Sequence, residues 1–116
     1  MRHNYKNLKI WQLGITIANE ISDLLLEFPK HERYDLSSQI SRCSVSIPSN
    51  IAEGSSRTDK SFSHFLDISL GSSFELITQL LIAKHRKYIN EIHFNQLEIK
   101  IEEFQRMTMG FQNGLK

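Results

Sequence analysis

The sequence predicts an all-α protein that folds as an antiparallel four-helix bundle with up-down-up-down connections. Apolar residues recur at spacings of three and four through most of the chain, which is helical periodicity. Short breaks near residues 29–33, 54–58 and 88–91 separate four such segments, so consecutive helices are expected to be antiparallel neighbours. A length of 116 residues and 13.5 kDa suits one core, and residues 1–116 are expected to form a single domain.

The composition is that of a soluble globular protein, with 40% hydrophobic and 23% charged residues. Lysine and arginine number 14 against 13 acidic residues, which gives a formal net charge of +1 and no global field directed at nucleic acid. The N-terminus lacks the pattern of a signal peptide, and no window approaches a membrane-spanning run. We therefore expect a cytoplasmic protein without a membrane partner.

The first helix is predicted over about residues 8–28, and it carries two apolar stripes. One stripe consists of Trp11, Ile15, Ala18, Ile21, Leu25 and Phe28. The other consists of Ile10, Leu13, Ile17 and Leu24. Because polar residues are confined to a narrow remainder, the apolar surface is wider than the core of a small bundle needs. We expect something besides this helix's own core to cover part of it.

The second helix is predicted over about residues 33–53, after Pro29 interrupts the first. Its core stripe is Leu36, Ile40, Cys43, Ile47 and Ile51. Beside that stripe runs a strip of small residues, Ser37, Ser41, Ser44, Pro48 and Ala52. Such a strip lets another backbone approach closely. We interpret Cys43, the single cysteine, as a small core residue rather than a reactive thiol.

Pro48 stands inside this helix, where a proline removes one backbone hydrogen bond and costs about 3 kcal/mol. A bend is the expected result. Two explanations stay open: the bend wraps the helix around a neighbour and frees the Ser44 carbonyl for another donor, or it serves packing alone. Gly54 is expected to end the helix as a left-handed cap.

The third helix is predicted over about residues 59–88, with Thr58 or Asp59 as its N-cap. Its main apolar stripe is Phe62, Leu66, Leu70, Phe74, Ile77, Leu81 and Tyr88, widened by Phe65, Leu76, Leu80 and Ala83. The run SLGSS at residues 69–73 disfavours helix on propensity alone, so another helix is expected to cross close by.

The fourth helix is predicted over about residues 91–113, capped by Asn90. Apolar residues follow a heptad pattern at Phe94, Leu97, Ile101, Phe104, Phe111 and Leu115. Thr108 interrupts the pattern where an apolar residue is due.

The patterns of known catalytic and metal chemistry are missing from the sequence. No histidine has a glutamate three residues before it, as carboxylate-bridged metal sites in bundles require. There is no haem-binding Cys-x-x-Cys-His motif, zinc-type cysteine cluster or glycine-rich phosphate loop. We expect a protein that is not an enzyme and that has no cofactor. Glu53 and Glu75 are the polar residues expected in tight surroundings, bonding freed backbone groups or a partner subunit's Arg42 or Arg57.

Basic residues cluster at the end of the third helix, in the segment AKHRKY at residues 83–88. Positive charge there stabilises the helix dipole, which is the simpler interpretation. The alternative is a phosphate-binding patch. Its candidate residues are Arg42, Arg57, Lys60, Lys84, Arg86 and Lys87.

Three stretches together resemble a known family: residues 8–14, 28–57 and 65–76. They look like the bacterial four-helix-bundle proteins encoded in intervening sequences of 23S ribosomal RNA genes. The most specific match is the run SQISRCSVSIPSNIAEG, which ends at Gly54. The matching positions are Gln39, Arg42, Ser46, Ile47, Pro48, Asn50, Ile51, Ala52, Glu53 and Gly54.

This resemblance implies a four-helix bundle that assembles into a homo-pentameric ring with a central channel. It also implies a possible nucleic-acid role, since a similar bundle protein that serves diversity-generating retroelements binds nucleic acid and a reverse transcriptase. We therefore expect a non-enzymatic oligomeric scaffold that binds RNA or DNA through the basic residues. The alternative is a protein-protein interaction adaptor without nucleic-acid binding. We also expect Asn50 and Glu53 to position the end of the second helix and the neighbouring subunit.

Overall fold

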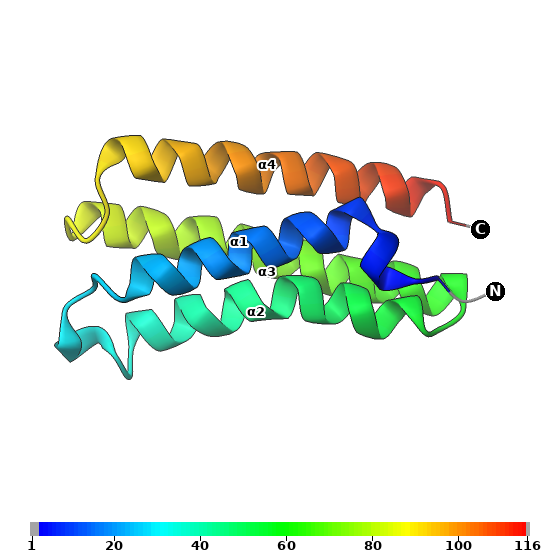
Figure 1. The fold of residues 1–116 in the computed structure, drawn as a ribbon, viewed down its shortest axis with the longest axis horizontal. Helices are drawn as coiled ribbons and strands as arrows, with labels where there is room; N and C mark the ends of the chain where they lie inside the picture. The colour runs from blue at the N-terminus through cyan, green and yellow to red at the C-terminus, as the bar shows by residue number, and fades with distance from the viewer. Residues whose placement is uncertain (1–2, 116) are drawn as a thin grey trace.

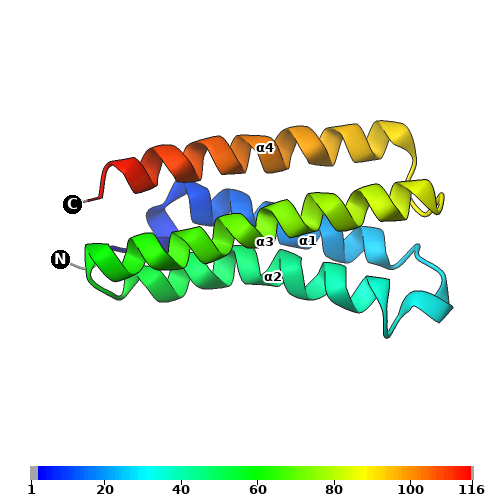
Figure 2. The ribbon, with the colours of Figure 1, turned by 180° about the vertical axis from the view of Figure 1, so that it is seen from behind.

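The computed structural model describes residues 3–115 and confirms the all-α four-helix bundle (Figure 1). Four helices alternate in direction, and both ends of the described chain lie at the same end of the bundle (Figures 1 and 2). The helices are α1 (Lys9–Leu25), α2 (Leu36–Ser55), α3 (Asp59–His85) and α4 (Glu91–Asn113). Two 3₁₀ turns precede α1 and α2, namely η1 (Tyr5–Asn7) and η2 (Lys30–Glu32).

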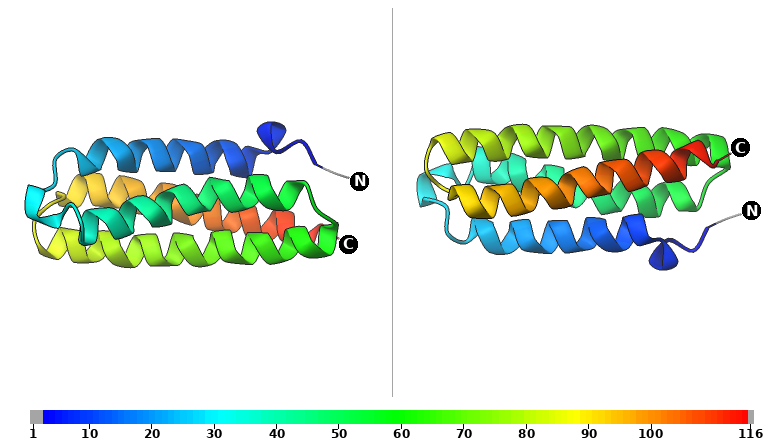
Figure 3. Two further views of the ribbon diagram at one scale, coloured as in Figure 1. Left: turned by 90° about the horizontal axis from the view of Figure 1, so that it is seen from below. Right: turned by 90° about the horizontal axis from the view of Figure 1, so that it is seen from above.

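Around the bundle the helices follow in the order α1, α2, α3, α4, and α4 closes the circle against α1. Seen from one side, α2 lies between α1 and α3, and from the other side α4 lies between them (Figure 3). The N-caps predicted from the sequence are present. The Thr58 hydroxyl accepts a hydrogen bond from the Ser61 amide, and the Asn90 side chain accepts one from the His93 amide.

Three helix ends differ from the predicted ones. Helix α1 ends at Leu25 rather than near 28, and α2 begins at Leu36 rather than 33 because η2 and a non-helical Asp35 occupy the connection. Helix α3 ends at His85 rather than 88, because Lys87 adopts a left-handed backbone with φ of 66°.

The core side of α1 takes most of the second predicted stripe and part of the first. Ile10, Ile17 and Leu24 are buried, together with Ile21 and Gly14. Of the other stripe, Ile21 and Phe28 are also buried, whereas Trp11, Ile15, Ala18 and Leu25 are half-buried. Helix α1 therefore keeps apolar side chains that its own core covers only in part, as the sequence predicted.

The core side of α3 differs from the predicted stripe. Phe74 and Leu81 are exposed, because repeated steps of four residues rotate steadily around a helix. The buried positions instead alternate steps of four and three, which is a heptad seam. They are Phe62, Leu66, Ser69, Ser73, Leu76, Leu80 and Ala83, all fully buried. Two serines thus take core positions.

These serines join a buried polar layer between helices. The Ser69 hydroxyl donates to the carbonyl of Ile47 in α2, at 2.7 Å. The Gln105 amide of α4 donates to Ser73 Oγ, at 3.0 Å. The heptad of α4 is confirmed, and Thr108 is fully buried within it. Small side chains and internal hydrogen bonds therefore let α2, α3 and α4 pack closely around SLGSS, as expected from the sequence.

Gly54 is not the left-handed cap that the sequence predicted. It keeps a helical backbone inside α2, and its role is close packing. A Cβ atom built there would come 2.7 Å from Phe62 Cδ1 and 2.7 Å from Phe65 Cβ. Gly14 of α1 faces Pro48 in a similar way, with a built Cβ 3.4 Å from Pro48 Cβ. Pro48 is buried and serves the α1–α2 contact.

Helix α3 is long and apolar enough, by length and composition, to cross a membrane. This finding corrects the expectation that no window approaches such a run. Core helices of soluble bundles pass the same test, and the fully buried heptad seam shows why α3 is so apolar here. We therefore interpret α3 as a core helix.

Candidate functional site

The six basic residues proposed for phosphate binding lie in three separate places. Lys84, Arg86 and Lys87 lie where α3 meets α4, and Arg57 and Lys60 lie at the opposite end, where α2 meets α3 (Figure 1). Arg42 lies within α2. The first two groups lie toward opposite ends of a molecule whose longest dimension is 45 Å, so the single chain does not bring the six together.

Three of these cations are already paired within the chain. Arg57 lies 3.0 Å from Glu53 and over the Phe65 ring, and Lys84 lies 3.2 Å from Glu91 and over the Phe94 ring.

Arg86, the third paired cation, donates a hydrogen bond to the Glu32 carboxylate at 2.8 Å. By contrast, the ion pairs among residues 3–115 include none made by Arg42, Lys60 or Lys87, whose side chains are exposed.

The pair made by Arg86 belongs to a cluster that sequence reasoning missed, formed by His31, Glu32, Arg86 and Tyr88; we call it the Glu32 cluster. The Glu32 carboxylate is buried, with 6% of its side chain exposed. It accepts hydrogen bonds from the Tyr88 hydroxyl at 2.7 Å and from Arg86. His31 Nε2 lies 3.8 Å from the carboxylate. The cluster ties the α1–α2 loop to the α3–α4 turn.

The left-handed Lys87 helps to build this cluster. The Lys87 and Tyr88 amides donate to the carbonyls of Lys84 and Ala83, which closes a Schellman motif at the end of α3. Lys87 takes the position that usually favours glycine. The reversal places Arg86 and Tyr88, on either side of Lys87, against the same carboxylate.

The surroundings of Glu32 lower the pKa of its carboxyl below the ordinary value. The Tyr88 hydrogen bond is the largest cause, opposed by burial and reinforced by the hydrogen bond and charge of Arg86. The same hydrogen bond raises the pKa of Tyr88. Both shifts favour an ionised Glu32 beside a protonated Tyr88.

A pH-dependent contribution to stability follows. Because the folded pKa of Glu32 lies below its unfolded value of about 4.3, its stabilising effect is fully present above that value and is lost as pH falls through the folded pKa. In Tyr88→Phe we expect lower stability at neutral pH and a smaller loss between neutral and acid pH. Urea unfolding at a series of pH values measures this, and an acid-side loss as large as that of the wild type would contradict it.

An apolar groove lies on the outer side of α1 and α2; we call it the α1–α2 groove. It is lined by Tyr5, Trp11, Ile15, Ala18, Asn19, Val45, Pro48, Ser49 and Ala52. Val45 is 53% exposed. On α3, exposed Phe74, Leu81 and Ile82 add further apolar surface. The half-buried stripe of α1 is thus continuous with apolar residues of a second helix.

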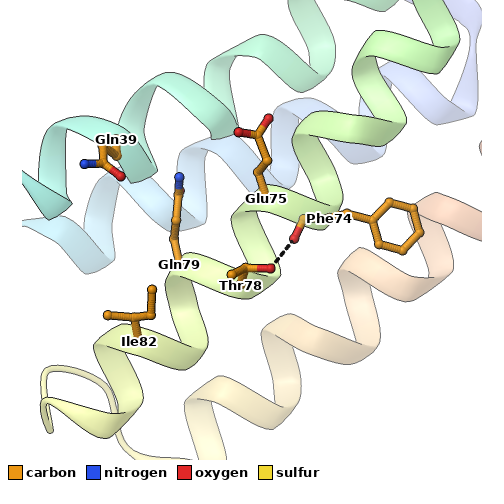
Figure 4. A pocket seen from close by; sticks show the side chains of 6 residues that line it. All are labelled: Gln39, Phe74, Glu75, Thr78, Gln79 and Ile82. Carbon is orange, nitrogen blue, oxygen red and sulfur yellow. Dashed lines mark hydrogen bonds between the residues drawn. The ribbon is translucent and has the colours of Figure 1, made fainter.

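Glu53 and Glu75 do not lie in tight surroundings, contrary to the prediction. Glu53 is exposed and pairs with Arg57 of its own chain. Glu75 is exposed on α3, beside an open pocket (Figure 4). Gln39 of α2 and Gln79 of α3 line the same pocket (Figure 4). Glu53 lies near the end of α2 and Glu75 beside the small residues of α3, but both side chains are exposed.

Cys43 is half-buried, so it is a peripheral rather than a central core residue. Gln79 Nε2 lies 3.4 Å from its sulfur, and burial raises the pKa of the thiol. No group of three histidine, cysteine, aspartate or glutamate side chains within residues 3–115 is arranged to hold a metal ion.

The chain is similar to a known protein family and to a solved structure. The model of the 23S rRNA-intervening sequence protein family matches residues 6–110. The chain belongs to this family. A crystal structure of a protein of unknown function from the S23 ribosomal protein family of Bacteroides thetaiotaomicron is similar in fold, with a TM-score of 0.82 and 20% identity. The alignment covers 90% of this chain and 95% of that one. No curated protein matches the chain.

In this chain, the residues of the run SQISRCSVSIPSNIAEG divide between core and surface. Ile47, Pro48, Ile51 and Gly54 are buried.

Asn50 Nδ2 donates to the carbonyl and hydroxyl of Ser46, at 2.9 Å each, and Ser46 Oγ lies 2.8 Å from Ser72 Oγ of α3. Gln39 and Arg42 are exposed, and Gln39 donates to Asp35. The run therefore builds the α2–α3 contact and leaves several polar side chains outside.

Proposed function

We propose that the protein is a non-enzymatic scaffold that assembles with copies of itself through its apolar outer surfaces. The α1–α2 groove is the single observation that carries this proposal. Trp11 and Ile15 belong to the part of the first α1 stripe that stays half-buried, and exposed Val45 continues this apolar surface onto α2. Apolar side chains grouped in this way are typical of protein interaction surfaces.

The resemblance noted in the sequence suggests a ring of five subunits. A ring needs two different surfaces on each subunit that fit one another. The α1–α2 groove and the exposed apolar residues of α3 lie on different helices, and they supply two candidate surfaces. The number of subunits is the quantity to measure.

The variant Val45→Asp tests this proposal. Its side chain is largely exposed in the single subunit, so the fold should tolerate the change, whereas an unpaired carboxylate inside an interface is costly. We expect the oligomer to dissociate toward the 13.5 kDa subunit, with association weakened about a hundredfold or more. Size-exclusion chromatography with light scattering measures the mass.

Thr16→Asp is the matched control, since Thr16 is exposed on α1 outside the groove. It should keep the mass of the wild type. A wild-type protein of subunit mass at every concentration, or equal dissociation of both variants, would contradict the proposal. Because the interface is apolar, the wild-type mass should change little between low and high salt.

We propose nucleic-acid binding as the second candidate function of the same scaffold. The exposed Lys87, at the turn where the sequence predicted a phosphate-binding patch, favours it. Assembly would repeat a weak patch around the oligomer and raise avidity. Fluorescence anisotropy of structured RNA and duplex DNA across a salt series tests it, because phosphate contacts weaken steeply with salt. The adaptor alternative predicts no binding.

A further inference from the structure

The bundle end formed by residues 26–35 and 86–90, which we call the loop end, gathers exposed cations from two distant parts of the sequence. Lys30 and Arg33 come from the α1–α2 loop, and Lys87 comes from the α3–α4 turn. The ion pairs of residues 3–115 include none made by these three side chains. Sequence reasoning included only Lys87, because the α1–α2 loop lies more than fifty residues away.

The Glu32 cluster holds the two parts of the loop end together. Glu32 follows Lys30 by two residues and precedes Arg33, and it is bonded to the residues on both sides of Lys87. Its negative charge is buried and paired with Arg86, so it does not lie on the surface beside the three exposed cations. The cations are therefore presented by a fixed backbone, which lowers the entropy lost when a ligand binds.

The loop end also exposes large side chains that can contact a flat ring. Tyr34, next to Arg33, is 88% exposed, and Leu26 is 85% exposed. A pocket of about 280 Å³ lies at this end, and its lining includes Leu26 and Arg33 but not Tyr34. This volume is below the range of pockets for drug-sized ligands, and it suits one planar group.

We propose that the loop end binds single-stranded nucleic acid, with Lys30, Arg33 and Lys87 at phosphates and Tyr34 stacked on an unpaired base. Cations beside an exposed aromatic ring are the combination that single strands need, because every base offers a face for stacking once it is unpaired. Base-paired strands keep their bases stacked inside, so a duplex would meet the cations alone. This inference deepens the nucleic-acid function proposed above and rests on it.

The charge at the loop end sets the strength of this binding. Glu27 and Asp35 are exposed on the same loop, so one subunit carries only a small positive excess. Binding by a single subunit is therefore expected to be weak and salt-dependent. With three phosphate contacts, the logarithm of affinity should fall by about 2 for each tenfold rise in salt concentration.

The test is fluorescence anisotropy of a labelled oligouridylate of about eight nucleotides, a length typical of single-strand sites. A duplex of the same length is measured beside it, at a protein concentration where the oligomer mass is known. We expect the single strand to bind more tightly than the duplex. Tyr34→Ala should weaken single-strand binding at least about fivefold and leave duplex binding almost unchanged. Arg33→Gln should weaken both and lower the salt slope by about 0.7.

Arg106→Gln is the matched control, because Arg106 is an exposed cation of α4 that lies far from the loop end. It should leave single-strand binding unchanged. Absence of single-strand binding at low salt would overturn the inference. The inference would also be overturned if an oligoglutamate peptide bound as tightly as the single strand and Tyr34→Ala did not weaken that binding. Such a result would show a site for acidic peptides. If structured RNA binds and only Lys60→Gln or Arg42→Gln weakens it, the inference fails while the nucleic-acid function stands.

Discussion

Replacing Gly54 with alanine is expected to destabilise the bundle by about 2 kcal/mol or more. The added Cβ would lie 2.7 Å from Phe62 Cδ1 and 2.7 Å from Phe65 Cβ, a separation at which something must move. The aromatic ring of Phe62 can turn slightly, but the Cβ of Phe65 is fixed to the α3 backbone. The ends of α2 and α3 would therefore have to separate. Urea unfolding at one fixed protein concentration measures the change.

Gly71→Ala is the matched control for this experiment. Gly71 also lies inside a helix, but it is exposed and a Cβ built there has no atom within 4 Å. We expect Gly71→Ala to stabilise the protein by about 0.5–1 kcal/mol, because alanine favours helix over glycine. Equal effects of the two substitutions would show that Gly54 is not set by packing against α3.

Replacing Phe62 with alanine is expected to have the largest effect, a loss of about 3–5 kcal/mol. Phe62 is fully buried, and it lies where several parts of the chain meet. Its ring centroid is 5.2 Å from that of His3 and 5.5 Å from that of Phe111. The substitution therefore removes contacts with His3, before α1, and with Phe111, near the end of α4, besides the contact with Gly54. Urea unfolding and loss of near-ultraviolet circular dichroism measure it.

The double variant Gly54→Ala with Phe62→Ala tests whether the two positions act through one contact. Once the Phe62 ring is absent, the alanine Cβ at position 54 can occupy part of the cavity. The double variant should therefore lose less stability than the sum of the losses in the two single variants. The contact with Phe65 remains, and for this reason we expect partial rather than complete relief. Strict additivity within about 0.5 kcal/mol would contradict the packing account.

The fold and the helix N-caps could be predicted because they depend on neighbouring residues. Apolar spacing in α4 repeats regularly, and Thr58 and Asn90 cap the helices that follow them through bonds to amides three residues away. Local patterns also showed that α1 has more apolar surface than its core needs. What they did not show is which stripe faces inward, because both stripes have helical spacing.

The candidate site was less predictable, because its parts come from distant segments. The basic cluster at Lys84–Lys87 was visible in the sequence, but its two ion pairs were not. Glu32 gave no signal in a loop with alternating charges, and its partners lie 54 and 56 residues further along the chain. The sequence predicted a close helix crossing at SLGSS, but not that Ser69 and Ser73 take core positions there, because the residues that bond them lie on other helices.

The sequence by itself determined the all-α class, the four helices and most of their ends, because backbone hydrogen bonds and caps in helices join residues only three or four positions apart. The tertiary structure alone decided the inward face of α1, the seam of α3, the packing role of Gly54 and the joining of two loops at Glu32. Those features depend on which surfaces meet when the helices pack, and burial then selects among faces that the sequence pattern leaves equivalent.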